Sequence, residues 1–192
     1  MNKTITVYCA SSEKIDQKYF NLADNVGRLL AEHSFDIIYG GGRVGMMGRV
    51  ADAAKKANGI VKGVIPDFMI SLELAHEGLD ELHVVEDMHK RQFKMMTDTD
   101  YILVLPGGCG TILEFIEAIT WKRLGLIHKP VIILNIDGYY DELLAMLEKT
   151  ISSRFMPPAM RCAWIEAKSV EKAMEIFNKG FDESESDRKI QY

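Results

Sequence analysis

The sequence predicts an α/β domain in which a doubly wound, mainly parallel sheet carries helices on both faces. Short apolar runs rich in β-branched residues alternate with longer amphipathic stretches along the chain, and this alternation is typical of β-α-β units. Residues 101–105 (YILVL) and 131–134 (VIIL) are apolar at every position, as expected of strands buried on both faces. The 192 residues, 47% of them apolar, suffice for one domain with its own core.

The expected strands and helices alternate along most of the chain. The strands are residues 5–7, 36–39, 61–65, 83–85, 101–105, 131–134 and 163–165. The helices are residues 16–32, where Ala23 and Leu30 share an apolar stripe, then 44–57, 88–98, 111–124, 139–152 and 170–178. This order predicts right-handed crossovers within a single domain over residues 1–181. Residues 182–189 (DESESDRK) lack apolar side chains, so a solvated, charged tail is expected over 182–192.

Composition disfavours several classes of function. Lys and Arg total 23 against 28 Asp and Glu, a net charge of −5, which argues against binding to nucleic acid or to an anionic membrane. No apolar run approaches the roughly 18 residues that a membrane span needs. Three cysteines without C-x-x-C spacing indicate reduced thiols rather than disulfides or a zinc site. A cytoplasmic protein without a bound metal is therefore expected.

A first glycine-rich loop, residues 40–48 (GGGRVGMMG), follows the second expected strand. Glycine lets a backbone approach a phosphate closely, and the helix that follows offers free N–H groups. Gly40, Gly42 and Gly45 formally fit G-x-G-x-x-G, but Ile60 stands about 20 residues on, where an NAD-binding motif needs an acid. The spacing therefore disfavours an NAD-dependent oxidoreductase. A tight strand–helix turn without a ligand remains the alternative.

A second glycine-rich loop, residues 106–111 (PGGCGT), lies between the apolar strand 101–105 and the next helix. It combines three glycines with a hydroxyl, Thr111, at a helix start. Neither loop is followed by Gly-Lys-Ser/Thr, which excludes a Walker phosphate loop. Two such loops in one small sheet predict neighbouring anion sites and a phosphorylated nucleoside as the ligand.

Glu114 and Glu117 are carboxylates in a helix that is apolar almost all round. Ionised groups in such a segment need a partner or a function. The alternative for Glu114 is structural, because Thr111-x-x-Glu114 also fits a capping box that closes the helix N-terminus. The pattern alone favours neither interpretation.

Arg91 follows the strand over residues 83–85, within the segment MHKRQ. Its alternative is a surface ion pair with Asp87 at i,i+4, which for a lone arginine is the better interpretation. Ser11 and Ser12 follow the first strand, where their hydroxyls either reach a phosphate or cap the helix that begins near Asp16.

Taken together, the segments VYCASS, YGGGRVGMMG, GVIP, MHKRQ, PGGCGTILE, TWKRLGLIHKP and NIDGYY stand in a characteristic order and spacing. The chain resembles the LOG ("Lonely Guy") family of cytokinin riboside 5′-monophosphate phosphoribohydrolases, once labelled possible lysine decarboxylases. The resemblance extends from Thr4 to about Phe155, and it is most specific in the pairing of PGGxGTxxE with the upstream MHxRK.

The resemblance implies a Rossmann-like fold and hydrolysis of the N-glycosidic bond of adenine-type nucleoside 5′-monophosphates, without a metal or organic cofactor. It places the catalytic residues on Arg91 and Glu114, and it implies a homodimer with the helices of these motifs near the subunit interface. With the loop residues above, the expected substrate contacts are Ser12, Gly41, Gly42, Glu73, Gln92, Gly108, Cys109, Gly110, Thr111 and Thr120.

The chain departs from the family pattern at four positions. Gln92 stands where lysine is usual, Cys109 where an aromatic residue is usual, and Leu113 where a second glutamate precedes Glu114. Ala10 replaces a glycine before the two serines. These changes bear on base preference and rate, because they lie beside the two essential residues.

Two other functions are consistent with parts of the pattern. Molybdenum cofactor carrier proteins have a related fold with similar glycine loops, so the fold alone does not decide between enzyme and carrier. The presence of both Arg91 and Glu114 favours the enzyme. A pyridoxal-phosphate lysine decarboxylase is disfavoured, because the sequence offers no recognisable lysine site for a Schiff base with an acidic partner.

Overall fold

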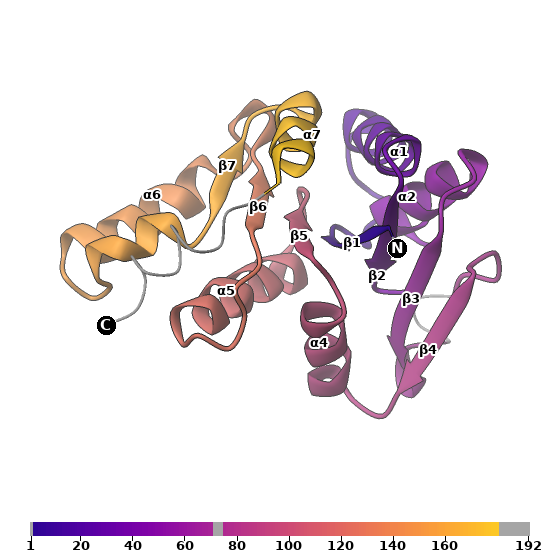
Figure 1. Cartoon of the computed structure of the whole chain (residues 1–192), viewed down its shortest axis with the longest axis horizontal. Coiled ribbons are helices and arrows are strands. Elements are labelled where there is room, and N and C mark those ends of the chain that lie inside the picture. The colour runs from indigo at the N-terminus through magenta and orange to yellow at the C-terminus, as the bar shows by residue number, and fades with distance from the viewer. Residues whose placement is uncertain (1, 71–74, 181–192) are drawn as a thin grey trace.

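The strands form one parallel sheet. The computed structural model describes residues 2–70 and 75–180, and in this part of the chain seven strands lie in the order β4-β3-β2-β1-β5-β6-β7 (Figure 1). Every neighbouring pair is parallel. The strands are β1 Lys3–Tyr8, β2 Phe35–Tyr39, β3 Val61–Pro66, β4 Glu81–Val85, β5 Tyr101–Val104, β6 Val131–Leu134 and β7 Ile165–Ala167.

Helices cover both faces of the sheet, which confirms the predicted fold class. One layer contains α1 Gln17–Glu32, α2 Gly45–Lys56 and α7 Val170–Lys179; the other contains α4 Met88–Thr97, α5 Cys109–Arg123 and α6 Asp141–Ser152 (Figure 1). Each layer closes over its own apolar cluster. Because side chains alternate along a strand, Val7 of β1 packs toward α1 and α2, whereas Tyr8 packs toward α4 and α5.

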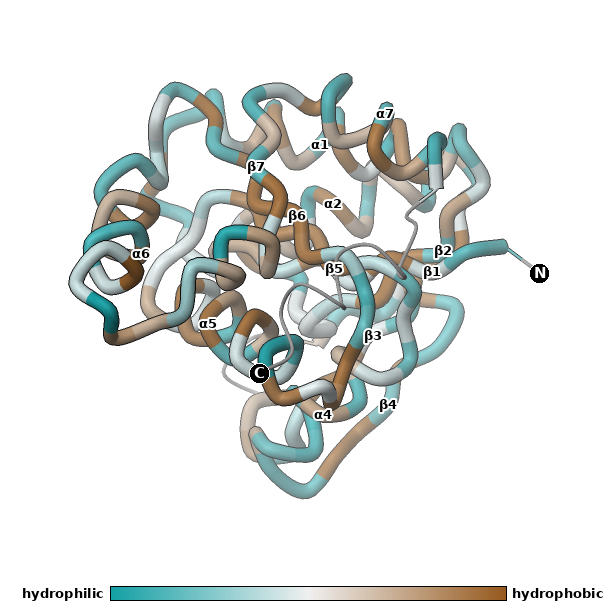
Figure 2. Tube along the Cα trace, turned by 60° about the vertical axis from the view of Figure 1, so that its left-hand side comes forward, coloured by the Kyte–Doolittle hydropathy of each residue, from teal (hydrophilic) through white to brown (hydrophobic). Residues whose placement is uncertain are grey.

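The central strands are buried from both sides, as their unbroken apolar runs predicted. All four residues of β5 and all four of β6 are buried, and Figure 2 shows apolar colour along both strands. The helices mix apolar and polar residues, since each turns only one side to the sheet. Among the described residues, no helix combines the length and apolar character needed to cross a membrane.

One predicted strand is displaced. We expected residues 163–165, but β7 spans Ile165–Ala167. The 3₁₀ helix Pro158–Cys162 follows Pro157 and holds the chain in a helical turn until just before Trp164. Only beyond it can the backbone extend to pair Ile165 with Ile132 of β6. The charged tail predicted over 182–192 lies outside the described residues.

The sheet has a topological switch point between β1 and β5. The chain builds outward from β1 to β4 and then continues on the opposite side of β1 with β5. In open sheets of this kind, ligands bind beyond the carboxyl ends of the strands at that point. The loops after β1, β2 and β5 meet there: the Ala10 N–H donates to the Pro106 carbonyl (3.2 Å), and the Met46 N–H to the Ala10 carbonyl (2.9 Å).

Candidate active site

A cleft of about 300 Å³ opens at the switch point. Its walls come from the end of β1 and the loop after it, from the start of α5, and from the side of α4 that faces the sheet. It is lined by Val7, Tyr8, Cys9, Ala10, Ser11, Ser12, Gly40, Met47, Met69, Met88, Arg91, Gln92, Met95, Gly108, Cys109, Gly110, Thr111, Leu113 and Glu114.

Arg91 projects from α4 into the wall of the cleft and is almost fully buried, with 5% of its surface exposed. Its Nε donates to the Val64 carbonyl at 3.1 Å and its Nη2 to the Gly40 carbonyl at 3.0 Å. A methyl group at Gly40 would stand 2.1 Å from Nη2, so glycine is required there to leave room for the guanidinium. The first glycine of the loop after β2 therefore helps to fix an arginine.

The burial of Arg91 excludes the interpretation that it belongs to an exposed ion pair. Asp87, the expected partner, is the N-cap of α4, and its carboxylate accepts a hydrogen bond from the Lys90 N–H at 2.8 Å. Asp87 thereby starts the helix that carries Arg91 and Gln92. Gln92 is also buried, with 6% of its surface exposed.

The start of α5 forms the opposite wall of the cleft. Gly108 is the N-cap, and no side chain caps this helix. The capping-box interpretation of Thr111 and Glu114 is therefore wrong, because the helix begins at Cys109 and both residues lie inside it. The N–H groups of the first turn have no acceptor within the helix, an arrangement that is favourable for an anion. A methyl group added at Gly108 or Gly110 would meet nothing within 4 Å, so the backbone is open to a ligand.

Tyr8, the last residue of β1, is buried and lines the same cleft. Burial raises the pKa of its phenol well above the ordinary value, and the negative charges of Glu114 and Glu117 raise this pKa further, while the charge of Arg91 opposes them. Arg91 and Glu114 therefore lie close enough to act on one buried hydroxyl. Burial also raises the pKa of Glu117, and the charge of His89 on α4 lowers it.

The structure brings most of the predicted site residues together. Eight line the cleft: Ser12, Arg91, Gln92, Gly108, Cys109, Gly110, Thr111 and Glu114. Gly41, Gly42 and Thr120 do not; Gly41 packs against β3 and Leu82, and the Thr120 hydroxyl donates to the Ile116 carbonyl (2.7 Å). Contact between these three residues and a substrate stays a prediction. Glu73 lies outside the described residues.

Sequence reasoning missed Tyr8 and a group of methionines. Met47, Met69, Met88 and Met95 all line the cleft, although they are far apart in sequence. The sulfur of Met69 lies 3.7 Å from Nη1 of Arg91. Methionine is flexible and polarizable, which suits contact with a flat aromatic ligand. The one sequence signal for these residues was that Tyr8 stands at the end of an expected strand, where ligands bind in sheets of this kind.

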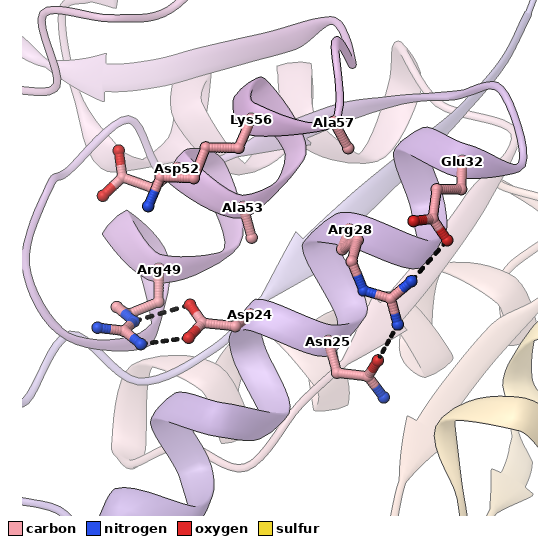
Figure 3. Close-up of a pocket in the computed structure, with 9 residues that line it drawn as sticks. All are labelled: Asp24, Asn25, Arg28, Glu32, Arg49, Asp52, Ala53, Lys56 and Ala57. Carbon is pink, nitrogen blue, oxygen red and sulfur yellow. Dashed lines mark hydrogen bonds and ion pairs between the residues drawn. The ribbon is translucent and has the colours of Figure 1, made fainter.

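A larger cavity, about 600 Å³, lies elsewhere between α1 and α2 (Figure 3). Four of its charged side chains pair with one another: Arg49 binds both carboxylate oxygens of Asp24, and Arg28 contacts Glu32. It is separate from both glycine loops. The volume of a cavity therefore does not identify the candidate active site. The position of the smaller cleft at the switch point and at the start of α5 does.

Solved structures share the fold. A molybdenum cofactor carrier protein of Chlamydomonas reinhardtii superimposes with a TM-score of 0.70 at 18% identity, covering 93% of this chain and 98% of that one. A molybdenum cofactor binding protein from Rippkaea orientalis superimposes with a TM-score of 0.69 at 24% identity, covering 93% of this chain and 97% of that one. At such identities the likeness establishes the architecture and leaves the function open.

Curated relatives are much more similar in sequence. A cytokinin riboside 5′-monophosphate phosphoribohydrolase of Rhodococcoides fascians is 43% identical over 173 residues, which is 90% of this chain and 87% of that protein. An enzyme of the same name from Arabidopsis thaliana is 39% identical, and the match covers 94% of this chain and 85% of that protein. The family model described as "Possible lysine decarboxylase" matches residues 47–177. The chain therefore belongs to the LOG family of cytokinin riboside 5′-monophosphate phosphoribohydrolases.

Proposed function

We propose that this protein hydrolyses the N-glycosidic bond of adenine-type nucleoside 5′-monophosphates, releasing the free base and ribose 5-phosphate in the cytoplasm. The observation that carries the proposal is that Arg91 and Glu114 line one cleft together with the open helix start of α5. The named activity of relatives up to 43% identical supports it.

The 5′-phosphate binds at the start of α5. Ser12, Cys109, Gly110 and Thr111 line the cleft, and the last three form the start of α5. The dipole of α5 adds a favourable interaction with the negative charge. Binding energy from the phosphate orients the glycosidic bond, which reacts at a distance from it.

Glu114 acts on the ribose. Cleavage of a glycosidic bond develops positive charge at the anomeric carbon, and a fixed carboxylate stabilises that charge. The same carboxylate accepts a proton from the attacking water, a step that typically contributes ~10²–10⁴-fold. Glu114 lies one turn beyond Thr111 on α5, so the helix sets the spacing between the phosphate and the reacting carbon.

Arg91 holds the substrate and stabilises the departing base as electrons move onto it. Two backbone carbonyls fix its guanidinium, so its position costs little reorganisation during the reaction. A guanidinium stays protonated at all physiological pH values, which suits it to electrostatic stabilisation rather than to proton donation.

A product assay tests the proposed function. Purified protein is incubated separately with AMP, with isopentenyladenosine monophosphate and with l-lysine, and the products are separated by chromatography. Free base and ribose 5-phosphate are expected from at least one nucleotide, and lysine is expected to remain intact. Stoichiometric nucleotide binding without release of base would contradict the hydrolase and favour a carrier.

We also propose that the chain forms a homodimer through the outer faces of α4 and α5. Phe93 on α4 is 58% exposed, and Leu124 and Leu126 at the end of α5 are 56% and 62% exposed. The rings of Phe93 and Trp121 pack edge to face, 6.0 Å between centroids, and join the two helices into one apolar surface. An apolar face of this kind marks an interaction site, and it borders the cleft at Leu113.

Phe93→Asp is expected to convert the dimer into a monomer, because a carboxylate would be buried without a partner in the interface. Light scattering coupled to size-exclusion chromatography measures the mass. The matched control is Met146→Asp, which places the same charge on α6 at a side chain that is 57% exposed. An unchanged mass for Phe93→Asp, or a monomeric parent protein, would refute this interface.

A further inference from the structure

We infer that Tyr139 and Tyr140 are positioning residues, which hold the β5–α5 loop in the orientation that receives the 5′-phosphate. The inference rests on the proposed function, because it assigns a role to the segment NIDGYY within the same reaction. Neither side chain lines the catalytic cleft; both act through the backbone of the loop.

Three consecutive carbonyl groups of the loop are each held from outside it. The Tyr140 hydroxyl donates to the Leu105 carbonyl at 2.7 Å, and the Tyr139 hydroxyl donates to the Gly107 carbonyl at 3.0 Å. Between them, the Pro106 carbonyl accepts from the Ala10 N–H at 3.2 Å. The loop is therefore tied to the loop after β1 on one side and to the turn after β6 on the other.

The turn that presents the two tyrosines is itself rigid. The Asn135 side chain accepts from the Tyr140 N–H (2.7 Å) and donates to the carboxylates of Asp141 (2.7 Å) and Glu166 (2.8 Å). Asn135 is buried, with 3% of its surface exposed. A polar side chain bonded on all sides fixes one conformation, so the two phenols approach the loop from a defined position.

We call the hydrogen bonds from Tyr139 and Tyr140 to the loop the tether. The geometry of the peptide bond explains how the tether orients the phosphate site. A trans peptide unit is planar, so its N–H points opposite to its carbonyl. With the Gly107 carbonyl turned toward Tyr139, the N–H of Gly108 points away from Tyr139. Gly108 is also the N-cap of α5, and its orientation sets the first turn whose N–H groups meet the phosphate.

The β5–α5 loop borders two cavities, which makes the catalytic cleft sensitive to the loss of these hydrogen bonds. A third cavity, of about 200 Å³, is lined in part by Tyr139, Pro106 and Gly107. Ala10, Ser12 and Gly108 line both this cavity and the catalytic cleft. With free space beside it, a loop that loses the Tyr139 bond has room to turn its carbonyl away, and the phosphate site then loses its shape.

The test compares substrates with and without the phosphate. In Tyr139→Phe, which keeps the ring and removes one hydrogen bond, we expect KM for AMP to rise about 3- to 10-fold, the usual effect of one such bond. We expect kcat/KM for adenosine, which lacks the phosphate, to change less than about twofold. If Tyr139 had a purely structural role, the variant would have a lower kcat/KM for AMP and for adenosine alike, and its melting temperature would fall.

Two further variants sharpen the comparison. Tyr19→Phe is the matched control, because Tyr19 contacts Tyr139 through its ring (5.7 Å between centroids), and its AMP kinetics are expected to match the parent. In Tyr140→Phe the Leu105 carbonyl loses its bond in the buried interior, so a lower melting temperature should accompany a higher KM for AMP.

Calorimetric binding of AMP and of inorganic phosphate separates this inference from the proposed function. If the parent releases no base but Tyr139→Phe binds AMP and phosphate more weakly, the hydrolase assignment fails and the tether stands. If base is released and Tyr139→Phe leaves KM for AMP unchanged, the tether is wrong. Absence of AMP and phosphate binding in the parent would also overturn it.

Discussion

Replacing Glu114 by glutamine is expected to lower kcat for AMP by about 10²–10⁴-fold, with a much smaller change in KM. The amide keeps the size of the side chain but removes the negative charge that stabilises the developing oxocarbenium ion and the base that accepts a proton from water. Single-turnover release of adenine, together with direct measurement of AMP binding, separates the chemical step from binding.

Glu117→Gln is the matched control for this prediction. Glu117 lies on the same helix three residues on, and burial raises its pKa, but it does not line the cleft. We expect it to retain most of the activity. An equal loss in both variants would mean that the total charge of α5 matters, and that no specific role belongs to the Glu114 carboxylate.

Replacing Gly40 by alanine is expected to lower kcat/KM by about 100-fold or more, even though residue 40 carries no chemistry. The new methyl group would stand 2.1 Å from Nη2 of Arg91 and 3.1 Å from the sulfur of Met47. The guanidinium must move and lose its 3.0 Å bond to the Gly40 carbonyl. A displacement of about 1 Å in a catalytic group typically costs on the order of 10²-fold in rate.

Gly78→Ala serves as the control, since its added methyl group would meet only the ring of His76, at 3.1 Å, and His76 does not line the cleft. Steady-state kinetics and melting temperature are measured for both variants. We expect Gly78→Ala to keep the parent activity. If Gly40→Ala kept it as well while remaining folded, the close approach of Gly40 to Arg91 would be irrelevant to catalysis.

Much of the architecture was predictable because it depends on local patterns. The unbroken apolar runs of β5 and β6 indicated strands buried on both faces, and the alternation with amphipathic helices indicated the parallel sheet that is observed. The second glycine loop was identified as a helix start, although the helix begins at Cys109, two residues before the expected position. The predicted start was too late because glycines at the N-cap and in the first turn are not typical of a helix interior.

The resemblance to the LOG family also came from the sequence, through motifs whose order and spacing are specific. It singled out Arg91 and Glu114, which line one cleft in the structure. Residue patterns alone left both with structural alternatives. The capping box and the surface ion pair were excluded only when the helix boundary and the burial of Arg91 were known.

The amino-acid sequence by itself determined the fold class, the family and the two residues proposed for catalysis, because periodicity and motif spacing are properties of neighbouring positions. The tertiary structure alone decided that Gly40 makes room for Arg91, that Tyr8 lines the cleft, and that the NIDGYY turn ties down the loop at the start of α5. The Tyr139–Gly107 and Arg91–Gly40 hydrogen bonds, for example, join residues 32 and 51 positions apart. Their formation depends on strand order and helix packing, which only the folded chain establishes.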